Sequence, residues 1–213
     1  MIRELVTLHA VEPGAVGLAG WGRPDGFLER QLSRWLHQWE AAHTVERPTL
    51  LRVAERLRHA LPPSRRTGIV HGDYKYDNVI LAADDPGRIV AILDWEMSTL
   101  GDPLCDLGLL LCFWDEPGEV PNPHSAGATA RPGFPTRAEM AQRYADQSGA
   151  DIGDLDWYIA FADFKLTVIL DGNQARYVAG ATVGSGFEQI QPFIEPLLDR
   201  AEQRASHLGE AAS

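Results

Sequence analysis

Apolar side chains in the first third of the chain recur every three or four residues, the spacing of one face of an α-helix. Leu28, Leu32, Trp35 and Trp39 form such a stripe, with charged residues between them. This spacing predicts an amphipathic helix whose tryptophans belong to the core. The other helices predicted in this way lie at residues 2–9 and 49–60. We therefore interpret residues 1–68 as a helical subdomain.

The pattern changes after residue 68 to short runs rich in Ile and Val, which are typical of strands. Strands are predicted at residues 69–71, 78–81 and 89–93. Asp84-Asp85-Pro86-Gly87 is a turn sequence, so the last two strands should form a hairpin. Residues 104–114 are apolar nearly all round and predict a buried helix, which Asp102 caps. Residues 69–114 are accordingly interpreted as one segment of short strands followed by a buried helix.

The last third of the chain predicts a loop followed by helices. Residues 115–135 are rich in Pro and Gly and form the long loop. Thr136 and Glu139 have the spacing of a capping box, which starts a helix reaching to about residue 148. Further helices are expected at about 154–177 and 187–207, so residues 136–213 are the C-terminal helices. The expected fold class for residues 1–213 is α+β and mostly helical, with a small β-hairpin.

Polar side chains gather in the loops beside this hairpin. His71-Gly72-Asp73-Tyr74-Lys75-Tyr76-Asp77-Asn78 lies between two predicted strands, and Asp94-Trp95-Glu96 follows the hairpin. Two carboxylates about 4 Å apart repel by roughly 4 kcal/mol at an effective dielectric constant of 20. A divalent cation would relieve this repulsion, and carboxylate and amide oxygens suit Mg²⁺. A hydrolytic metal site built on His71, Asp73 and Asp94 is a further hypothesis.

These two motifs resemble those of the protein-kinase-like phosphotransferases. His71, Asp73 and Asn78 stand at the offsets of the catalytic loop, and Asp94 stands where that family has its metal-binding Asp. Gly after the His and Trp after the Asp resemble the aminoglycoside phosphotransferase branch. The context looks most like its subgroup that includes the kinase-like domain fused to some acyl-CoA dehydrogenases. The resemblance covers the whole chain as a C-terminal lobe, with the hairpin carrying the catalytic and metal loops.

The resemblance implies roles for the residues of these loops. Asp73 would orient the acceptor hydroxyl and take its proton, Lys75 would neutralise charge on the transferred group, and His71 would brace the loop. Asn78 and Asp94 would hold Mg²⁺ bridging the phosphates of ATP. Glu96 either adds a metal-site carboxylate or is an exposed surface acid, and Lys75 could instead be a solvated partner of Asp77.

The acceptor is expected to be a small molecule with a hydroxyl group. The acyl-CoA dehydrogenase-linked relatives suggest a hydroxyacyl-CoA, while the acidic C-terminal part would suit an aminoglycoside or a choline-like alcohol. Candidate substrate contacts are Asp102, whose other interpretation is a helix cap, and Lys165 with Arg176, whose other interpretation is ordinary surface charges. The last two lie eleven residues apart, or three helical turns.

The resemblance also implies an N-terminal lobe that we do not find in residues 1–70. That lobe would bring a glycine-rich loop over the phosphates, a strand lysine and a helix Glu. The two lysines of the chain are Lys75 and Lys165, so none lies in the first 74 positions. The resemblance therefore predicts a C-terminal lobe that is weakly active or inactive alone. The alternative is an interaction module, with a second copy or a partner covering the face where the N-terminal lobe would sit.

Composition narrows the classes of partner. Apolar residues make up 45% and charged residues 23% of the 213, as in ordinary globular proteins. The net charge is -11, with 10 basic and 7 acidic residues over 1–68 against 9 and 23 over 69–213. This balance argues against nucleic acid or an anionic membrane as the partner. The N-terminus lacks a signal-peptide pattern, and the longest apolar run is too short for a membrane span, so a cytoplasmic location is expected.

Overall fold

The computed structural model describes residues 1–43, 45–119, 127–181 and 190–208. The chain divides into two compact units, each built from two stretches of sequence. The first unit comprises Met1–Phe27 and Pro63–Leu155, and the second comprises Leu28–Pro62 and Asp156–Ser213. No helix within the described ranges has the length and apolar character needed to cross a bilayer.

The helices agree closely with the expected ones. They are α1 (Ile2–His9), α2 (Phe27–Ala42), α3 (Pro48–His59), α4 (Leu104–Cys112), α5 (Arg137–Ser148), α6 (Leu155–Val178) and α7 (Gln191–Ser206). The predicted capping box of α5 is present, with Thr136 accepting from the Glu139 amide and the Glu139 carboxylate accepting from the Thr136 amide. Residues 187–189 of the predicted last helix and 120–126 of the predicted long loop lie outside the described residues.

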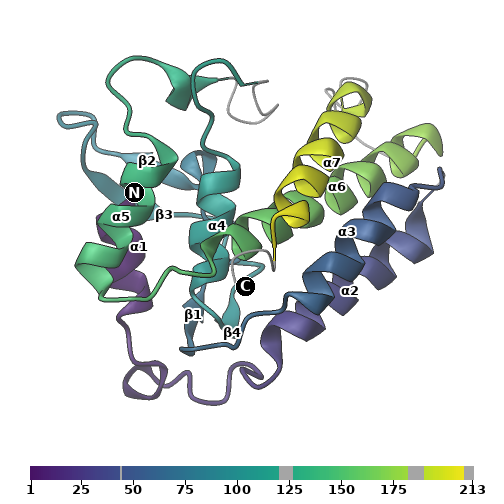
Figure 1. The fold of residues 1–213 in the computed structure, drawn as a ribbon. Helices are drawn as coiled ribbons and strands as arrows, with labels where there is room; N and C mark the ends of the chain where they lie inside the picture. The colour runs from purple at the N-terminus through teal and green to yellow at the C-terminus, as the bar shows by residue number, and fades with distance from the viewer. Residues whose placement is uncertain (44, 120–126, 182–189, 209–213) are drawn as a thin grey trace. The chain divides into compact units, whose positions relative to one another are not determined.

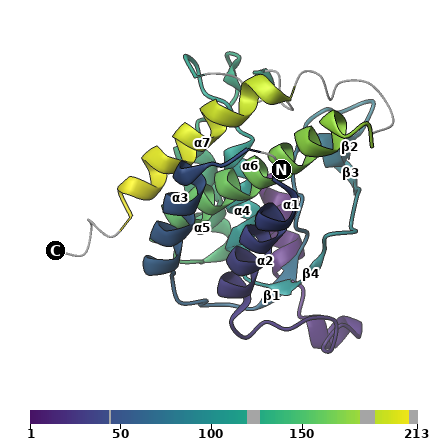
Figure 2. The same ribbon diagram turned by 90° about the vertical axis from the view of Figure 1, so that its right-hand side faces the viewer.

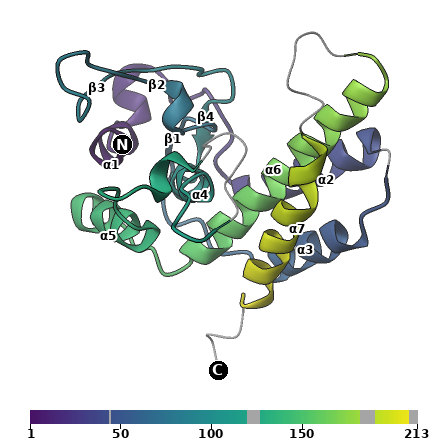
Figure 3. The ribbon, with the colours of Figure 1, turned by 90° about the horizontal axis from the view of Figure 1, so that it is seen from above.

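The first unit combines three helices with two small antiparallel sheets. Its strands are β1 (Gly68–Val70), β2 (Val79–Leu81), β3 (Ile89–Ile92) and β4 (Thr99–Gly101). The predicted hairpin is confirmed, with Val79 opposite Ile92, and β1 pairs with β4 in the register Gly68 to Gly101. The helix α5 packs against both α1 and α4, and α1 also contacts β1 (Figures 1 and 3). The helix α1 thus connects β1 with α5.

The strand β4 was not predicted. Thr99-Leu100-Gly101 is too short to show an alternating pattern, and it is a strand because β1 pairs with it. A Cβ atom at Gly101 would lie 2.6 Å from the Phe27 ring, so this position has room only for glycine. The residue type is therefore selected by packing against a side chain remote in sequence.

The second unit is a group of helices tied together by buried aromatic and charged side chains. The predicted stripe of α2 is buried, with Leu32 fully inside and Trp39 3% exposed. The Trp39 indole Nε1 donates to Asp171 Oδ2 of α6 at 2.8 Å, and Arg47 Nε donates to Asp171 Oδ1 at 2.9 Å. The helices α3 and α7 lie side by side (Figure 2).

Candidate functional site

A buried carboxylate of α4 fixes the turn that begins the catalytic-loop motif. Asp106 Oδ2 accepts a hydrogen bond from the His71 amide at 2.6 Å, and Oδ1 accepts one from the Gly72 amide at 2.8 Å. Asp106 is 0% exposed. Because these bonds use the backbone of the loop, its side chains remain available for other contacts. A charge-assisted bond of this kind is roughly twice as strong as a neutral one.

Gly72 is required at this turn. Its φ of 84° lies in the left-handed region, and a Cβ atom there would stand 2.6 Å from the Met97 carbonyl oxygen. Any side chain would therefore displace either the loop or the segment that leads into β4. Gly72 thus explains in physical terms why a glycine follows His71 in this motif.

Two residues missed in the sequence stand behind Asp106. His9 of α1 places Nε2 3.2 Å from Asp106 Oδ2, and its Nδ1 lies 2.8 Å from the Tyr144 hydroxyl of α5. Both side chains are buried, and burial raises the pKa of Tyr144 above its ordinary value. The chain of contacts from α5 through α1 to α4 ends on the backbone of the catalytic loop. A lone His and a lone Tyr on amphipathic helices gave no signal of this connection.

His71 connects the catalytic loop to the hairpin. Its Nε2 donates to the Leu93 carbonyl oxygen at 2.9 Å, and its Nδ1 accepts from the Asp73 amide at 3.2 Å. Its ring packs against Trp95, with centroids 4.6 Å apart. With both nitrogens engaged by the backbone, His71 lies where a bracing residue would lie.

Asp73, Lys75 and Asn78 lie together. The Lys75 ammonium forms an ion pair with Asp73 Oδ2, and Asn78 Nδ2 donates to both the carbonyl oxygen and Oδ2 of Asp73, at 2.8 Å each. The Lys75 Nζ also lies 5.5 Å from the centroid of the Phe113 ring. The Asp73 carboxylate is thus oriented by an amide and a cation, with its other oxygen left for a ligand.

The hairpin register brings Asp94 close to Asn78. The Leu93 amide donates to the Asn78 carbonyl oxygen at 2.8 Å, so Asp94 follows directly after the residue paired with Asn78. Asp94 is exposed and has a φ of 64°, a left-handed conformation that costs a non-glycine residue about 1 kcal/mol or more. Backbone strain of this kind is often found at functional sites.

The donor set of this pair fits a nucleotide-bound Mg²⁺. Asn78 uses Nδ2 for its bonds to Asp73, which turns the amide oxygen away from that carboxylate. Mg²⁺ is usually held by one or two protein oxygens together with phosphate and water. Within the described ranges no three His, Cys, Asp or Glu side chains gather as a metal site. Glu96, the third expected ligand, is exposed two residues beyond Asp94.

The remaining candidate residues lie elsewhere. Asp102 is 2% exposed, and its two oxygens accept from the Leu104 amide and the Ser64 hydroxyl, each at 3.0 Å, which is the geometry of a helix cap. Lys165 and Arg176 belong to the second unit. Lys165 is 9% exposed with its ammonium 5.3 Å from the centroid of the Trp35 ring, and the exposed Arg176 bonds to Asn173.

A cavity of about 280 Å³ opens beside the catalytic loop. The first three of its lining residues belong to the loop, and the rest come from α4, its C-terminal end and the segment after residue 127. The lining comprises Lys75, Tyr76, Asp77, Leu110, Phe113, Trp114, Ala128 and Thr129. The sequence placed Phe113 and Trp114 in the predicted buried helix and gave no sign of a cavity.

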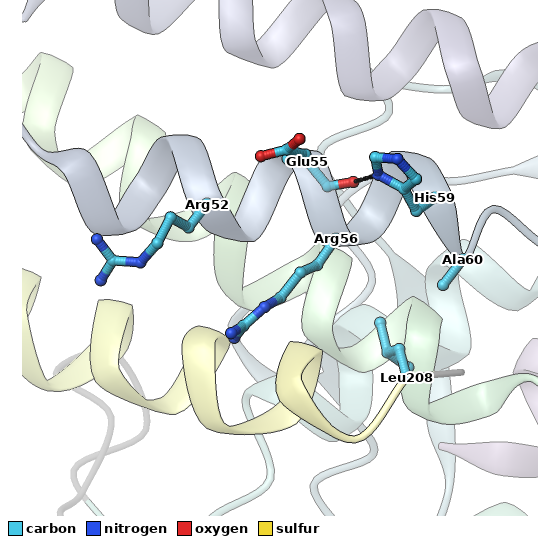
Figure 4. Close-up of a pocket in the computed structure, with 6 residues that line it drawn as sticks. All are labelled: Arg52, Glu55, Arg56, His59, Ala60 and Leu208. Atoms are coloured by element: carbon cyan, nitrogen blue, oxygen red, sulfur yellow. Dashed lines mark hydrogen bonds between the residues drawn. The ribbon is translucent and has the colours of Figure 1, made fainter. Parts of the chain in front are cut away.

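A second cavity, of about 440 Å³, lies within the second unit along α3 (Figure 4). Arg52 and Arg56 extend from α3 toward α7, and His59 Nδ1 bonds to the Glu55 carbonyl oxygen at 2.9 Å. Arg52 Nε donates to Glu202 of α7 at 3.0 Å. Arg56 and His59 occupy the last turn of α3, where positive charge complements the helix dipole. Helix stability and pairing account for these charges.

Comparison with known proteins gives consistent results. The model of the phosphotransferase enzyme family matches residues 1–158. Acyl-CoA dehydrogenase family member 11 from Gallus gallus is 31% identical over 218 residues, a match covering 97% of this chain and 27% of that protein. The chain thus spans about a quarter of the length of this curated relative.

Solved structures show the same fold. A Ralstonia eutropha JMP134 protein, provisionally named an aminoglycoside phosphotransferase, matches with a TM-score of 0.84 and 29% identity, over 98% of this chain and 64% of that one. A choline/ethanolamine kinase family protein from Mesorhizobium loti matches with a TM-score of 0.53 and 19% identity, over 95% and 65% of the two chains. The second likeness concerns the fold alone.

Proposed function

Because the chain belongs to the phosphotransferase enzyme family, we propose that its catalytic-loop cluster transfers the γ-phosphoryl group of ATP to a hydroxyl group of a small molecule. The family comparison confirms the resemblance drawn from the two motifs, and the fold is the kinase-like one of that family. The observation that carries the proposal is the contact of Asp73 with both Lys75 and Asn78.

The geometry supports Asp73 as the group that receives the acceptor's proton. A general base must lie within hydrogen-bond reach of the proton that it takes, and its orientation must be held. Asn78 and Lys75 hold the Asp73 carboxylate, while Asp106 holds the turn on which it stands. Asp73 would accept the hydroxyl proton as the acceptor oxygen bonds to the γ-phosphorus and the bond from that phosphorus to the ADP oxygen breaks, and Lys75 would compensate charge there.

Asn78 and Asp94 would hold the metal of Mg·ATP, through the amide oxygen and the carboxylate. When bound, Mg·ATP supplies the phosphoryl group, and the metal neutralises its negative charge. Glu96 would contribute through a water molecule or remain in solvent. For the acceptor, the curated relatives named as acyl-CoA dehydrogenase family members favour a hydroxyacyl-CoA, and the neighbour named for aminoglycosides keeps a cationic sugar as the alternative.

The proposal is tested by assaying ADP release from Mg·ATP with a panel of hydroxyl compounds. We expect Asp73→Asn to lower kcat by about 10²- to 10⁴-fold, the usual contribution of a general base. Asp84→Asn, in the exposed turn between β2 and β3, is the matched control and should leave kcat unchanged. Equal rates for the two variants would reject the role given to Asp73.

A second candidate function is that of an interaction module. The hairpin and the residues after it expose apolar side chains, including Ile80 at 46%, Val90 at 52% and Leu93 at 44%. A nucleotide, a partner protein or a second copy of the chain would cover such a surface. Light scattering that finds a dimer, together with the absence of Mg·ATP binding in calorimetry, would favour this candidate over the enzyme.

A further inference from the structure

The cavity beside the catalytic loop has the composition of a site for an apolar group. Two of its eight lining residues are charged, Lys75 and Asp77, three are fully apolar, and Trp114 and Tyr76 add aromatic rings. We propose that this cavity binds the apolar part of the acceptor, so that the acceptor is an alcohol whose hydroxyl is carried by a hydrocarbon chain or an aromatic ring. This inference rests on the proposed phosphotransferase function.

The aromatic wall of the cavity is fixed before any ligand binds. Trp114 is 2% exposed, and its Nε1 donates to the Pro135 carbonyl oxygen at 2.8 Å. Its ring packs against Tyr76 and Phe134, with centroids 5.7 and 6.0 Å away. Because the only polar atom of the indole is already bonded, the ring offers a ligand its π face and no hydrogen bond.

The part of the wall formed by Ala128 and Thr129 is also built into the fold. Thr129 Oγ1 donates to the Asp115 carbonyl oxygen at 3.0 Å, and the Gly127 amide donates to the Asp115 carboxylate at 3.2 Å. These bonds attach the segment that carries Ala128 to the residue directly after Trp114. A preformed wall lowers the entropy cost of binding, which favours a specific ligand over incidental contacts.

The cavity adjoins the proposed base through Lys75. The Lys75 ammonium touches the Asp73 carboxylate and also lies 5.5 Å from the Phe113 ring centroid at the cavity wall. An alcohol whose apolar part lies on Phe113 can therefore bring its hydroxyl to the Asp73–Lys75 pair. This proximity distinguishes the cavity from the one along α3, which lies in the other unit.

The electrostatics of the lining disfavour a polycationic acceptor. The Lys75 ammonium is paired with Asp73, so Asp77 is the one other carboxylate at this wall, and a single carboxylate cannot pair with several ammonium groups. Burial raises the pKa of Tyr76, so its phenol stays neutral well above physiological pH. The lining therefore selects for apolar contact and against an aminoglycoside.

The size of the cavity agrees with a modest apolar group. Its volume of about 280 Å³ is near the lower end of the range for small-molecule sites. An apolar cavity of about 150 Å³ holds benzene in a well-studied engineered protein. The cavity beside the catalytic loop can therefore hold one ring or a short hydrocarbon chain, and the remainder of a larger acceptor would lie outside it.

The binding experiment uses straight-chain primary alcohols from 1-butanol to 1-octanol, titrated into the full chain without ATP and followed by NMR. Each added methylene should tighten the dissociation constant by about fourfold until the cavity is full. Ala128→Trp, which fills the cavity from an exposed position, should weaken 1-octanol binding by at least tenfold. Ala138→Trp, the same change at an exposed position of α5, should not alter binding.

The kinetic experiment separates this inference from the proposed function. With Mg·ATP, kcat/KM should rise with chain length, and Ala128→Trp should lower kcat/KM for 1-octanol by at least tenfold while Ala138→Trp leaves it unchanged. Chain-length-dependent binding without phosphoryl transfer would overturn the proposed function and leave the apolar site standing. Phosphoryl transfer that ignores chain length and Ala128→Trp, or tighter binding of kanamycin than of 1-octanol, would overturn the apolar site.

Discussion

Each of the two units contains a carboxylate that is 0% exposed, and the two carboxylates have different partners. Asp106 of the first unit accepts from two backbone amides of the catalytic loop and contacts His9. Asp163 of the second unit binds two arginines of α7, with Arg200 Nε donating at 3.0 Å and Arg204 pairing with its other oxygen.

The two buried acids therefore have different roles: Asp106 holds a loop, and Asp163 joins two helices. The backbone amides bonded to Asp106 fix the path of the loop, so the side chains of the loop can make other contacts. Asp163 is bonded instead to the side chains of Arg200 and Arg204, and these ion pairs join α6 to α7. Burial and charge alone therefore do not mark a functional acid, since the identity of its donors decides its role.

The largest loss in the free energy of unfolding is expected for Asp163→Ala. Removing one partner of a buried ion pair costs roughly 3–5 kcal/mol, and because Arg200 and Arg204 are about a fifth exposed we expect about 3 kcal/mol. Urea unfolding measures the loss. Asp199→Ala, at an exposed position of α7, should change stability by less than about 0.5 kcal/mol. Similar values for both variants would remove the helix-joining role.

The next effect concerns the loop. Asp106→Asn keeps the shape of the side chain but sets an NH₂ group against a backbone donor, and an unsatisfied buried donor costs about 1–3 kcal/mol. We expect a loss of about 2 kcal/mol and hydrogen exchange that is 10- to 100-fold faster at His71 and Gly72. Mass spectrometry of exchanged peptides locates the change. Faster exchange in α6 and α7 with an unchanged loop would contradict the comparison.

The exposed metal-ligand candidate gives a smaller effect. Asp94 is the one non-glycine residue with positive φ among those the structure describes, so this form of strain is a property of the first unit. Asp94→Ala should be about 1 kcal/mol less stable than Asp94→Gly, because only glycine adopts this conformation without strain. Both variants should lose Mg·ATP affinity alike in calorimetry. Equal stability of the two would show that the conformation carries no strain.

The helices and the hairpin could be predicted because their signals are local. The stripe from Leu28 to Trp39 and the turn at residues 84–87 need no knowledge of the rest of the chain. The strand β4 and the assignment of segments to two units could not be predicted, since both depend on pairing between distant parts of the chain. Three residues such as Thr99-Leu100-Gly101 become a strand only when a partner is present.

The candidate site divides in the same way. His71, Asp73, Lys75 and Asn78 are close in sequence, so their spacing was informative, and their contacts with one another agree with it. The connection from Tyr144 through His9 could not be seen, because packing of α1 against α5 creates it. The aromatic cavity was hidden for a related reason, since Phe113 and Trp114 are equally typical of a core.

The smallest effect is a difference in alkaline sensitivity. Burial raises the pKa of Tyr74 and Tyr144, both in the first unit, above the ordinary value of 10.0. Because the two tyrosines have a higher pKa in the folded protein than in the unfolded chain, the unfolded chain loses their protons first. Their contribution to stability is therefore complete below pH 10 and is lost as the pH rises beyond it. Asp163 is bonded instead to arginines, and arginine side chains do not deprotonate in proteins.

Urea midpoints measured from pH 8 to pH 11 should therefore fall above pH 10. The fall should be smaller in the double variant with Tyr74→Phe and Tyr144→Phe. At neutral pH the free energy of unfolding of that variant should be lower by about 1 kcal/mol for each hydrogen bond removed, one to the Met1 carbonyl oxygen and one to His9. In Asp163→Ala the urea midpoint should still fall above pH 10, because this variant keeps both tyrosines. If Asp163→Ala flattened the profile and the tyrosine variant did not, the alkaline sensitivity would belong to the second unit.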